Sequence, residues 1–381
     1  PLGSDWGHDF SAAEYIWDPI DGLAYPDFRK PWFGWLLGGL GQSLGYLKAA
    51  QLISKLALLG TVGAAALLTA ALANRLVALV AAASVLLMPL AMDGALWVNH
   101  YPILGAAVGL AFASAAAAVR WRQLGWVVLA GVAAGASYAL DLRGGVAVPV
   151  AGVLVLLGSW SARSAVSRLA VFGVVLGGIM AHAQWLEVAF DVPQLPIEQQ
   201  LMVQRAGTLE QARRGLVGGQ EVQAGCGALA VRPFEISTAW SGCGVALREA
   251  SFKRLATAQL IPSIGFMGFL FLCLIPPRER WRSVLASAVV FGVPMVSVAV
   301  GMAWVTYFDR YLLPFAAVIS SMAPVGVARV LGAMSGRSSK LSRLTVPLGA
   351  VIASVLVLQV WPGWSARSLD APETVHSSES H

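Results

Sequence analysis

Residues 102–119 read PILGAAVGLAFASAAAAV and decide the class of fold. The run has no charged side chain, and about 18 apolar residues are enough for a helix to cross a bilayer. Similar runs, separated by short charged turns, fill most of a chain that is 57% hydrophobic and 12% charged. Soluble domains carry about 25% charged residues, so the composition predicts an all-α polytopic membrane protein.

The apolar runs predict roughly ten transmembrane helices. A further run at 31–50 is a candidate for a short or interfacial helix. The expected span cores are 52–73, 76–92, 102–119, 125–140, 145–160, 169–186, 257–275, 283–304, 311–333 and 344–361.

The same runs divide the chain into regions. An extracytoplasmic first loop with interfacial helices occupies 1–50, and a polar tail occupies 363–381. Between them we expect transmembrane helices over 51–186 and 257–362, with a second extracytoplasmic loop over 187–256.

The turns between spans are charged asymmetrically, and this predicts the orientation. Every second turn is basic, and of the 20 acidic residues only Glu279 falls in such a turn. The positive-inside rule places these basic turns in the cytoplasm. The first loop and the 187–256 loop are then extracytoplasmic, and we expect a bacterial inner (plasma) membrane. The net charge of +6 belongs mostly to the cytoplasmic turns, so the predicted partner is the bilayer and no nucleic acid is expected.

Two of the 3 cysteines, Cys226 and Cys243, lie in the long outer loop. An oxidising compartment favours a disulfide between them, and two free thiols are the alternative.

The first loop gathers polar and aromatic residues in GSDWGHDFSAAEY (3–15) and AYPDFRKP (24–31). Because Trp and Tyr favour the membrane–water boundary, we expect this loop to lie on the bilayer surface with its carboxylates facing an aqueous pocket. A solvated loop with an aromatic belt is the alternative.

The order of these residues resembles the first outer loop of GT-C-type integral-membrane glycosyltransferases. More narrowly, the chain resembles the branch of protein O-mannosyltransferases, aminoarabinose transferases and their bacterial relatives, and is similar to glycosyltransferase family 39. Asp5 matches the family's loop acid, with Asp9 as the competing register. The second element is matched by Tyr25, Asp27, Lys30 and Pro31. AGVAAGASYALDLRGGVAVP (130–149) and YFDRYLLPFAAVIS (307–320) are similar to two later family motifs.

The resemblance implies a polyprenyl-phosphate-linked sugar as donor and a hydroxyl on a protein, lipid or glycan as acceptor. It implies transfer at the extracytoplasmic face with inversion at the anomeric carbon, and no tightly bound cofactor. It also implies one further transmembrane helix before residue 1.

A carboxylate near the acceptor can act as general base, and Asp5 or Asp9 is the candidate. Arg310, Arg143 and Lys30 are candidates to bind the donor phosphate, since arginine can donate two hydrogen bonds to phosphate oxygens. For the two arginines, snorkelling to head groups or ion pairs with Asp309 and Asp141 is the alternative.

The helix that begins WVNHYPIL (97–104) departs from the family pattern, which often has a carboxylate there. Since this chain offers Asn99, His100 and Tyr101 instead, we expect no protein-bound divalent metal, although His8 beside Asp5 and Asp9 could help to hold one ion. His100 can also be a polar cap of the helix. The predicted pocket residues are His8, Tyr25, Asp27, Asn99, His100 and Tyr311.

A transporter or flippase of a lipid-linked or polar substrate is the main rival, and a non-catalytic membrane subunit is the second. Transporters bind substrate near the bilayer midplane, often with charges deep in their spans. Here the spans are almost free of ionisable groups and charge collects at the outer mouth, which favours chemistry at the surface.

Overall fold

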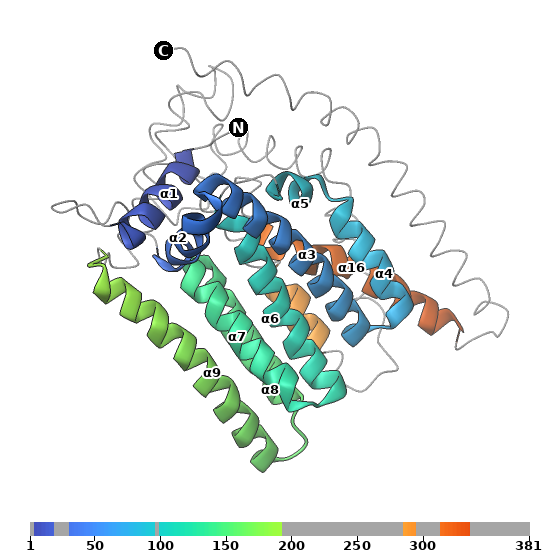
Figure 1. The fold of residues 1–381 in the computed structure, drawn as a ribbon. Coiled ribbons are helices and arrows are strands. Elements are labelled where there is room, and N and C mark those ends of the chain that lie inside the picture. The colour runs from blue at the N-terminus through green and yellow to red at the C-terminus, as the bar shows by residue number, and fades with distance from the viewer. Residues whose placement is uncertain (1–3, 19–29, 96–98, 193–284, 295–312, 336–381) are drawn as a thin grey trace, which may run out of the picture.

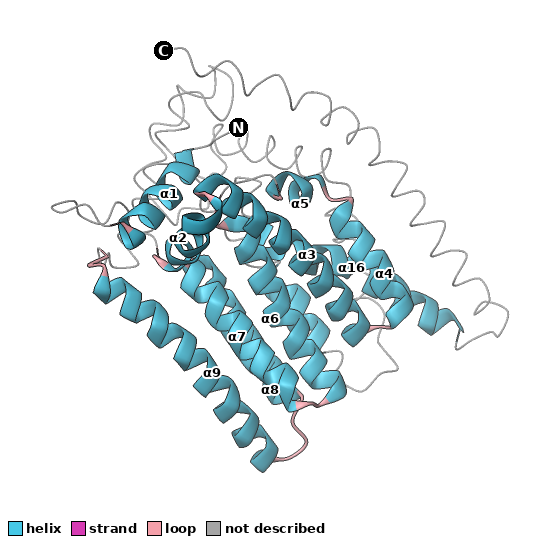
Figure 2. Cartoon of the chain, viewed as in Figure 1, coloured by secondary structure: helices cyan, strands magenta, loops and turns pink. Residues whose placement is uncertain are grey.

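The computed structural model describes residues 4–18, 30–95, 99–192, 285–294 and 313–335. All regular structure in these ranges is helical (Figure 2). Three of the described helices are long and apolar enough to cross a membrane, namely α3 (Tyr46–Leu72), α6 (Tyr101–Trp121) and α9 (Ala162–Ala189). The chain is an integral membrane protein, as the composition predicts.

The other helices of the bundle are shorter. The apolar helices among them are α4 (Arg75–Leu86), α7 (Leu124–Leu140) and α8 (Ala147–Leu157). The 3₁₀ helix η1 (Leu142–Val146) lies between α7 and α8. Helix α16 (Ala316–Ser335) packs on α3, α4 and α6. The predicted runs at 257–275 and 344–361 lie outside the described residues, so the count of ten spans stays a prediction.

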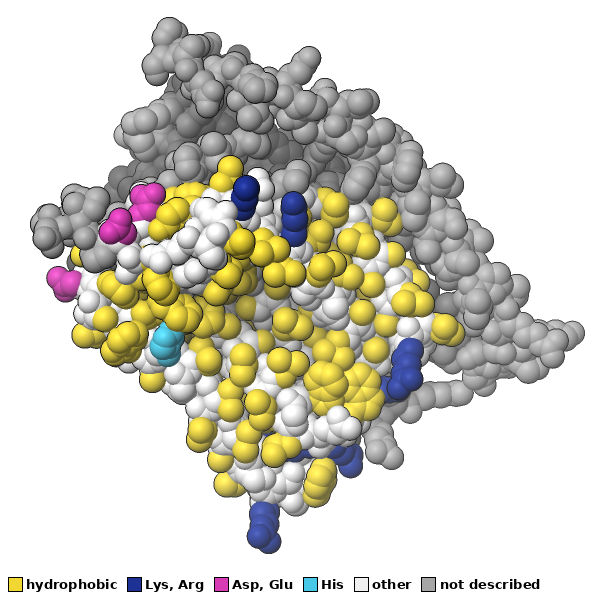
Figure 3. Space-filling model, viewed as in Figure 1, with side chains coloured by type: hydrophobic (Ala, Val, Ile, Leu, Met, Phe, Trp, Pro, Cys, Tyr) yellow, Lys and Arg dark blue, Asp and Glu magenta, His cyan; other side chains and the backbone are white. Residues whose placement is uncertain are grey.

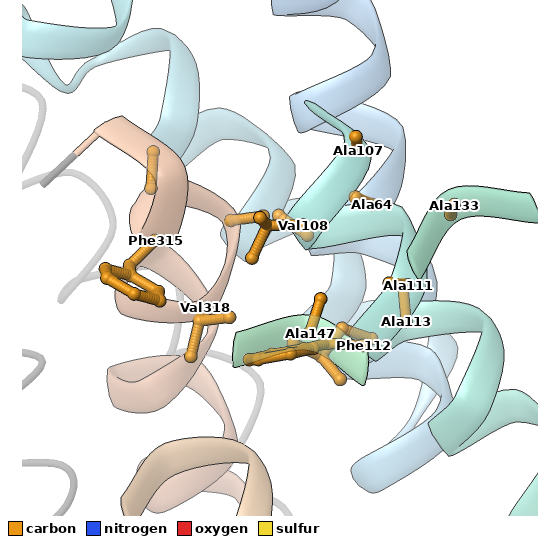
Figure 4. Packing of buried hydrophobic residues seen from close by; sticks show 14 of the residues in the cluster. Ala64, Ala107, Val108, Ala111, Phe112, Ala113, Ala133, Ala147, Phe315 and Val318 are labelled. Atoms are coloured by element: carbon orange, nitrogen blue, oxygen red, sulfur yellow. The ribbon is translucent and has the colours of Figure 1, made fainter. Parts of the chain in front are cut away.

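Helix α6 forms the centre of the bundle and is buried along most of its length. Its alanines and glycines let neighbours approach closely, the usual way in which membrane helices pack. A Cβ atom at Gly105 would lie 2.7 Å from the backbone oxygen of Leu313, and one at Gly109 would lie 2.8 Å from Cβ of Ala317. Figure 4 shows the contact, where Val108 and Phe112 of α6 face Val318 of α16.

Alternating helix directions give the bundle two ends. Helix α6 begins at one end, α7 returns to it, α8 starts from it through η1, and α9 returns to it again. We call this the His100 end, after the residue that precedes α6. The opposite end, where α9 begins, is the Arg168 end.

Short helices lie across the His100 end, where α1 (Ser4–Trp17) packs on α2 (Trp32–Leu44), and α2 packs on α3 (Figure 1). The indole Nε1 of Trp17 donates to the backbone oxygen of Trp35 at 2.9 Å, which ties the two short helices together. Helix α5 (Pro89–Gly94) also lies at this end in Figure 1. With 13 residues, α2 is too short to span a bilayer upright.

Candidate functional site

A buried polar cluster lies at the His100 end, where segments far apart in the sequence meet. Helix α1 contributes Asp9, the start of α6 contributes His100 and Tyr101, and the turn after α7 contributes Asp141 and Arg143. We call these five residues the His100 cluster.

Asp9 is 6% exposed and faces the start of α6. Its Oδ2 accepts a hydrogen bond from the backbone nitrogen of His100 at 3.2 Å and lies 3.2 Å from the ring Nδ1. Both contacts use the same carboxylate oxygen. The other oxygen, Oδ1, makes no hydrogen bond to any residue that the structure describes. This leaves Asp9 one anchored oxygen and one that can accept a proton.

The His100 ring lies between two carboxylates. On the far side from Asp9, its Nε2 lies 3.3 Å from Oδ2 of Asp141, within ion-pair distance but not aligned as a hydrogen bond. The rings of Phe33 and Tyr101 lie near the imidazole, with centroids 6.2 Å and 4.3 Å away. The ring is therefore in contact with two aromatic side chains and has one carboxylate beside each of its nitrogens.

The turn DLRGG (141–145) positions the next two members of the cluster. Asp141 caps η1, because its Oδ1 accepts from the backbone nitrogen of Arg143 at 2.7 Å. Gly144 permits the tight turn, since a Cβ there would overlap the backbone oxygen of Ser137, whose hydroxyl donates to the Gly144 oxygen at 2.9 Å. The Arg143 guanidinium then donates to the hydroxyl of Tyr101 at 2.8 Å, and its Nε lies 4.0 Å from Asp141.

Charge pairing sets the ionisation of the cluster. Burial lowers the pKa of His100, but the carboxylates of Asp9 and Asp141 outweigh it and raise the pKa to about 9. Burial likewise raises the pKa of Asp141, but Arg143 and His100 hold it well below its usual range. At neutral pH, His100 is therefore an imidazolium beside ionised Asp141.

A second polar contact at the same end joins Lys30, just before α2, to α9. Its Nζ is 3.0 Å from Oε1 of Glu187 and 4.1 Å from the ring centroid of Tyr138. One turn away, the indole Nε1 of Trp32 donates to Nδ1 of His182 at 3.1 Å. Lys30 is thus neutralised by Glu187 in this state, and binding a phosphate would require it to exchange partners.

The structure brings together Asp9, His100 and Arg143 from the sequence-based candidates. Asn99 lies beside them, but its Oδ1 accepts from the backbone nitrogen of Tyr101 at 3.1 Å, so its contact is that of a helix cap. Asp5 lies on α1 one turn before Asp9, and its side chain, like that of His8, is outside the described part. The remaining candidates, Tyr25, Asp27, Arg310, Tyr311, Cys226 and Cys243, lie outside the described residues.

Sequence reasoning missed two members of these contacts. Asp141 was expected only as a partner for Arg143, and its contact with His100 was not expected. Glu187 was not considered, although it directly follows the predicted span 169–186. An acid at the outer end of an apolar span is the signal that marks both.

Within the described ranges, no group of three His, Cys, Asp or Glu residues could hold a metal ion. The carboxylates of Asp9 and Asp141 instead contact opposite nitrogens of one imidazole ring.

No known family model matches the chain, and no curated protein matches it. Several solved structures resemble its fold. ArnT from Cupriavidus metallidurans bound to undecaprenyl phosphate has a TM-score of 0.53 and 16% identity, covering 93% of this chain and 60% of that chain. Archaeoglobus fulgidus AglB, an archaeal oligosaccharyltransferase in complex with an inhibitory peptide and a dolichol-phosphate, has a TM-score of 0.57 and 15% identity, covering 96% and 52%.

An apo structure of the Archaeoglobus fulgidus oligosaccharyltransferase gives the same picture, with a TM-score of 0.53, 14% identity and coverage of 94% and 51%. The chain thus spans between half and about three fifths of the length of these proteins. The likeness extends over most of this chain and confirms the resemblance expected from its outer-loop motifs. The chain has the fold of GT-C membrane glycosyltransferases.

Proposed function

We propose that this protein is a glycosyltransferase that moves a sugar from a polyprenyl-phosphate-linked donor to an acceptor hydroxyl. The observation that carries the proposal is the buried His100 cluster at the end of a GT-C fold, beneath the short helices α1 and α2. Two structures of similar fold hold polyprenyl phosphates, undecaprenyl phosphate in one and a dolichol-phosphate in the other. The positive-inside rule assigns the His100 end to the extracytoplasmic face, which we take to be that of a bacterial inner membrane.

Asp9 is the proposed general base. Its Oδ2 is anchored at the start of α6, which leaves Oδ1 to accept the proton of the acceptor hydroxyl. The acceptor oxygen bonds to the anomeric carbon as the bond from that carbon to the phosphate oxygen breaks. The bonding electron pair leaves with the polyprenyl phosphate. Attack from the face opposite the leaving phosphate inverts the anomeric carbon.

Arg143 is the proposed ligand of the donor phosphate. Its side chain is 31% exposed, and Tyr101 and Asp141 hold it at the rim of the cluster. A guanidinium placed beforehand stabilises the charge that develops on the leaving phosphate, most strongly where water is excluded. Arg310 is proposed as a second phosphate ligand, and Lys30 as a third once Glu187 releases it.

The test is release of polyprenyl phosphate by the purified protein from a panel of lipid-linked sugars with a mixed acceptor extract. We expect release by the parent and a loss of at least about 100-fold in Asp9→Asn, with donor binding retained. Glu14→Gln, an acid-to-amide change at an exposed position of the same helix, is the matched control.

Asp5→Asn shows, in the same assay, which of the two aspartates is the general base. If Asp5→Asn loses polyprenyl phosphate release while Asp9→Asn keeps it in full, the general base is Asp5 and not Asp9. Equal release by the parent and both variants would refute a catalytic aspartate in α1. No release from any donor would refute the proposed activity for those donors.

A further inference from the structure

The His100 cluster has more negative charge at its centre than a neutral histidine could balance. Asp9 and Asp141 each lie within 3.3 Å of a different nitrogen of the same ring. The three side chains are well buried, with 4% of the His100 side chain, 8% of Asp9 and 16% of Asp141 exposed. An isolated carboxylate at such a site is costly, so a cation is needed between the two.

Among the described residues, the elements around the ring contribute two acids and two aromatic rings. Helix α1 presents Asp9, and the turn after α7 presents Asp141, with Arg143 behind it. Helix α2 presents the ring of Phe33, and α6 presents the ring of Tyr101. Arg143 Nε lies 4.0 Å from Oδ1 of Asp141. Among the described side chains, only the His100 ring contacts both carboxylates.

We propose that His100 is a positioning residue whose ring bridges Asp9 and Asp141, where a bound cation would otherwise have to balance them. This inference rests on the proposed glycosyl transfer, because it explains how Asp9 is oriented for that reaction. His100 does not give up its proton during turnover. Its contact with Oδ2 holds the Asp9 carboxylate in place and leaves Oδ1 available for the acceptor hydroxyl.

The arrangement also explains the departure of this chain from the pattern of the family it resembles. A second acid at the start of α6 would add negative charge beside Asp9. This chain places a cationic side chain there and supplies the second acid from the turn after α7, at Asp141. The ring thereby joins α1, α6 and α7 through one charged group.

The first test needs no activity. The full chain is produced with ¹⁵N-labelled histidine, and the imidazole signals are followed by NMR between pH 6 and 10. Of the 5 histidines, the one whose signal disappears in His100→Gln should carry protons on both ring nitrogens at pH 7.5. We expect it to lose the second proton near pH 9 in the parent protein, and at a lower pH in Asp9→Asn. A ring with a single proton at pH 7 would overturn the proposal.

The second test separates positioning from folding. We expect His100→Gln to lower kcat for polyprenyl phosphate release at least about tenfold, with KM for the donor changed less than about threefold. The parent rate should decline as pH rises through about 9, and His100→Gln should lose this alkaline limb. His182→Gln keeps an acceptor for Trp32 and is the matched control, with parent-like rates expected.

The outcomes for the two proposals are distinct. If the parent releases product but His100→Gln keeps both its rate and the alkaline limb, the positioning role is wrong while the transferase stands. If the parent is inactive with every donor, the transferase proposal fails. The NMR titration then decides alone whether His100 is the bridging cation.

Discussion

The two ends of the helical bundle both bury basic side chains, but they use them differently. At the Arg168 end, the guanidinium of Arg168 donates to the backbone oxygens of Ala118 at 3.2 Å and Gly158 at 3.3 Å, and also to that of Arg122. These carbonyls close the C-terminal ends of α6 and α8. At the His100 end, charged side chains meet other charged side chains.

This difference indicates which end does chemistry. The last carbonyls of a helix lack partners within the helix, and a nearby cation both satisfies them and complements the helix dipole. The burial of Arg168 is thus explained by its structural role alone. Buried ion pairs, by contrast, are weak evidence for stability, because desolvation can exceed the attraction between the charges. The acidic side chains that Figure 3 shows lie at the same end of the bundle as α1.

Removing one arginine from each end tests most clearly whether the two ends differ in their effect on the rate. Arg143→Gln should lower kcat for polyprenyl phosphate release by about 100-fold, since one preorganised donor to a developing charge contributes that much. Arg122→Gln at the Arg168 end removes an exposed side chain, so its rate should stay within about twofold of the parent. A similar loss in both variants would show that the two ends are not functionally distinct.

The pH dependence of stability sharpens the comparison. The pKa of His100 is about 9 in the folded protein and about 6.5 in the unfolded chain. Its contribution, about 3 kcal/mol, is therefore fully present below pH about 6.5 and is lost as pH rises through about 9. The thermal unfolding midpoint in detergent should fall over this window. The fall should be smaller in His100→Gln, and an equal fall in both proteins would remove His100 as its cause.

Removing the cation of the other end should affect stability alone. Arg168 is 4% exposed, and Arg168→Ala removes the side-chain donor of the Gly158 and Arg122 carbonyls, while the Ala118 carbonyl still accepts from the Arg122 backbone nitrogen. We expect the free energy of unfolding to fall by about 2 kcal/mol. The rate per folded molecule should stay unchanged, as measured after correction for the folded fraction. A loss of rate at full folding would mean that the Arg168 end takes part in the reaction.

The sequence was sufficient to predict the helical membrane class and the ends of several spans. The run 102–119 corresponds to α6 (Tyr101–Trp121), and the run 125–140 to α7 (Leu124–Leu140), because length and apolar character determine where such helices lie. His100 and Arg143 were predicted at the outer ends of spans for the same reason.

The contacts within the His100 cluster could not be predicted from the sequence in this way. Asp5 and Asp9 are four residues apart and share one face of α1, so spacing alone does not choose between them. The contact between Asp9 and His100 joins residues 91 positions apart and depends on how α1 lies over the bundle. The contact between His100 and Asp141 depends likewise on how α6 packs against α7.

A structure of the full chain with a polyprenyl-phosphate-linked sugar bound, determined by cryo-electron microscopy, tests the central claim most directly. We expect the phosphate within hydrogen-bonding distance of Arg143 and the anomeric carbon of the sugar facing Oδ1 of Asp9, with His100 still between the two carboxylates. A phosphate held at the Arg168 end, or a donor that leaves the His100 cluster untouched, would contradict the assignment of the reaction to this end of the bundle.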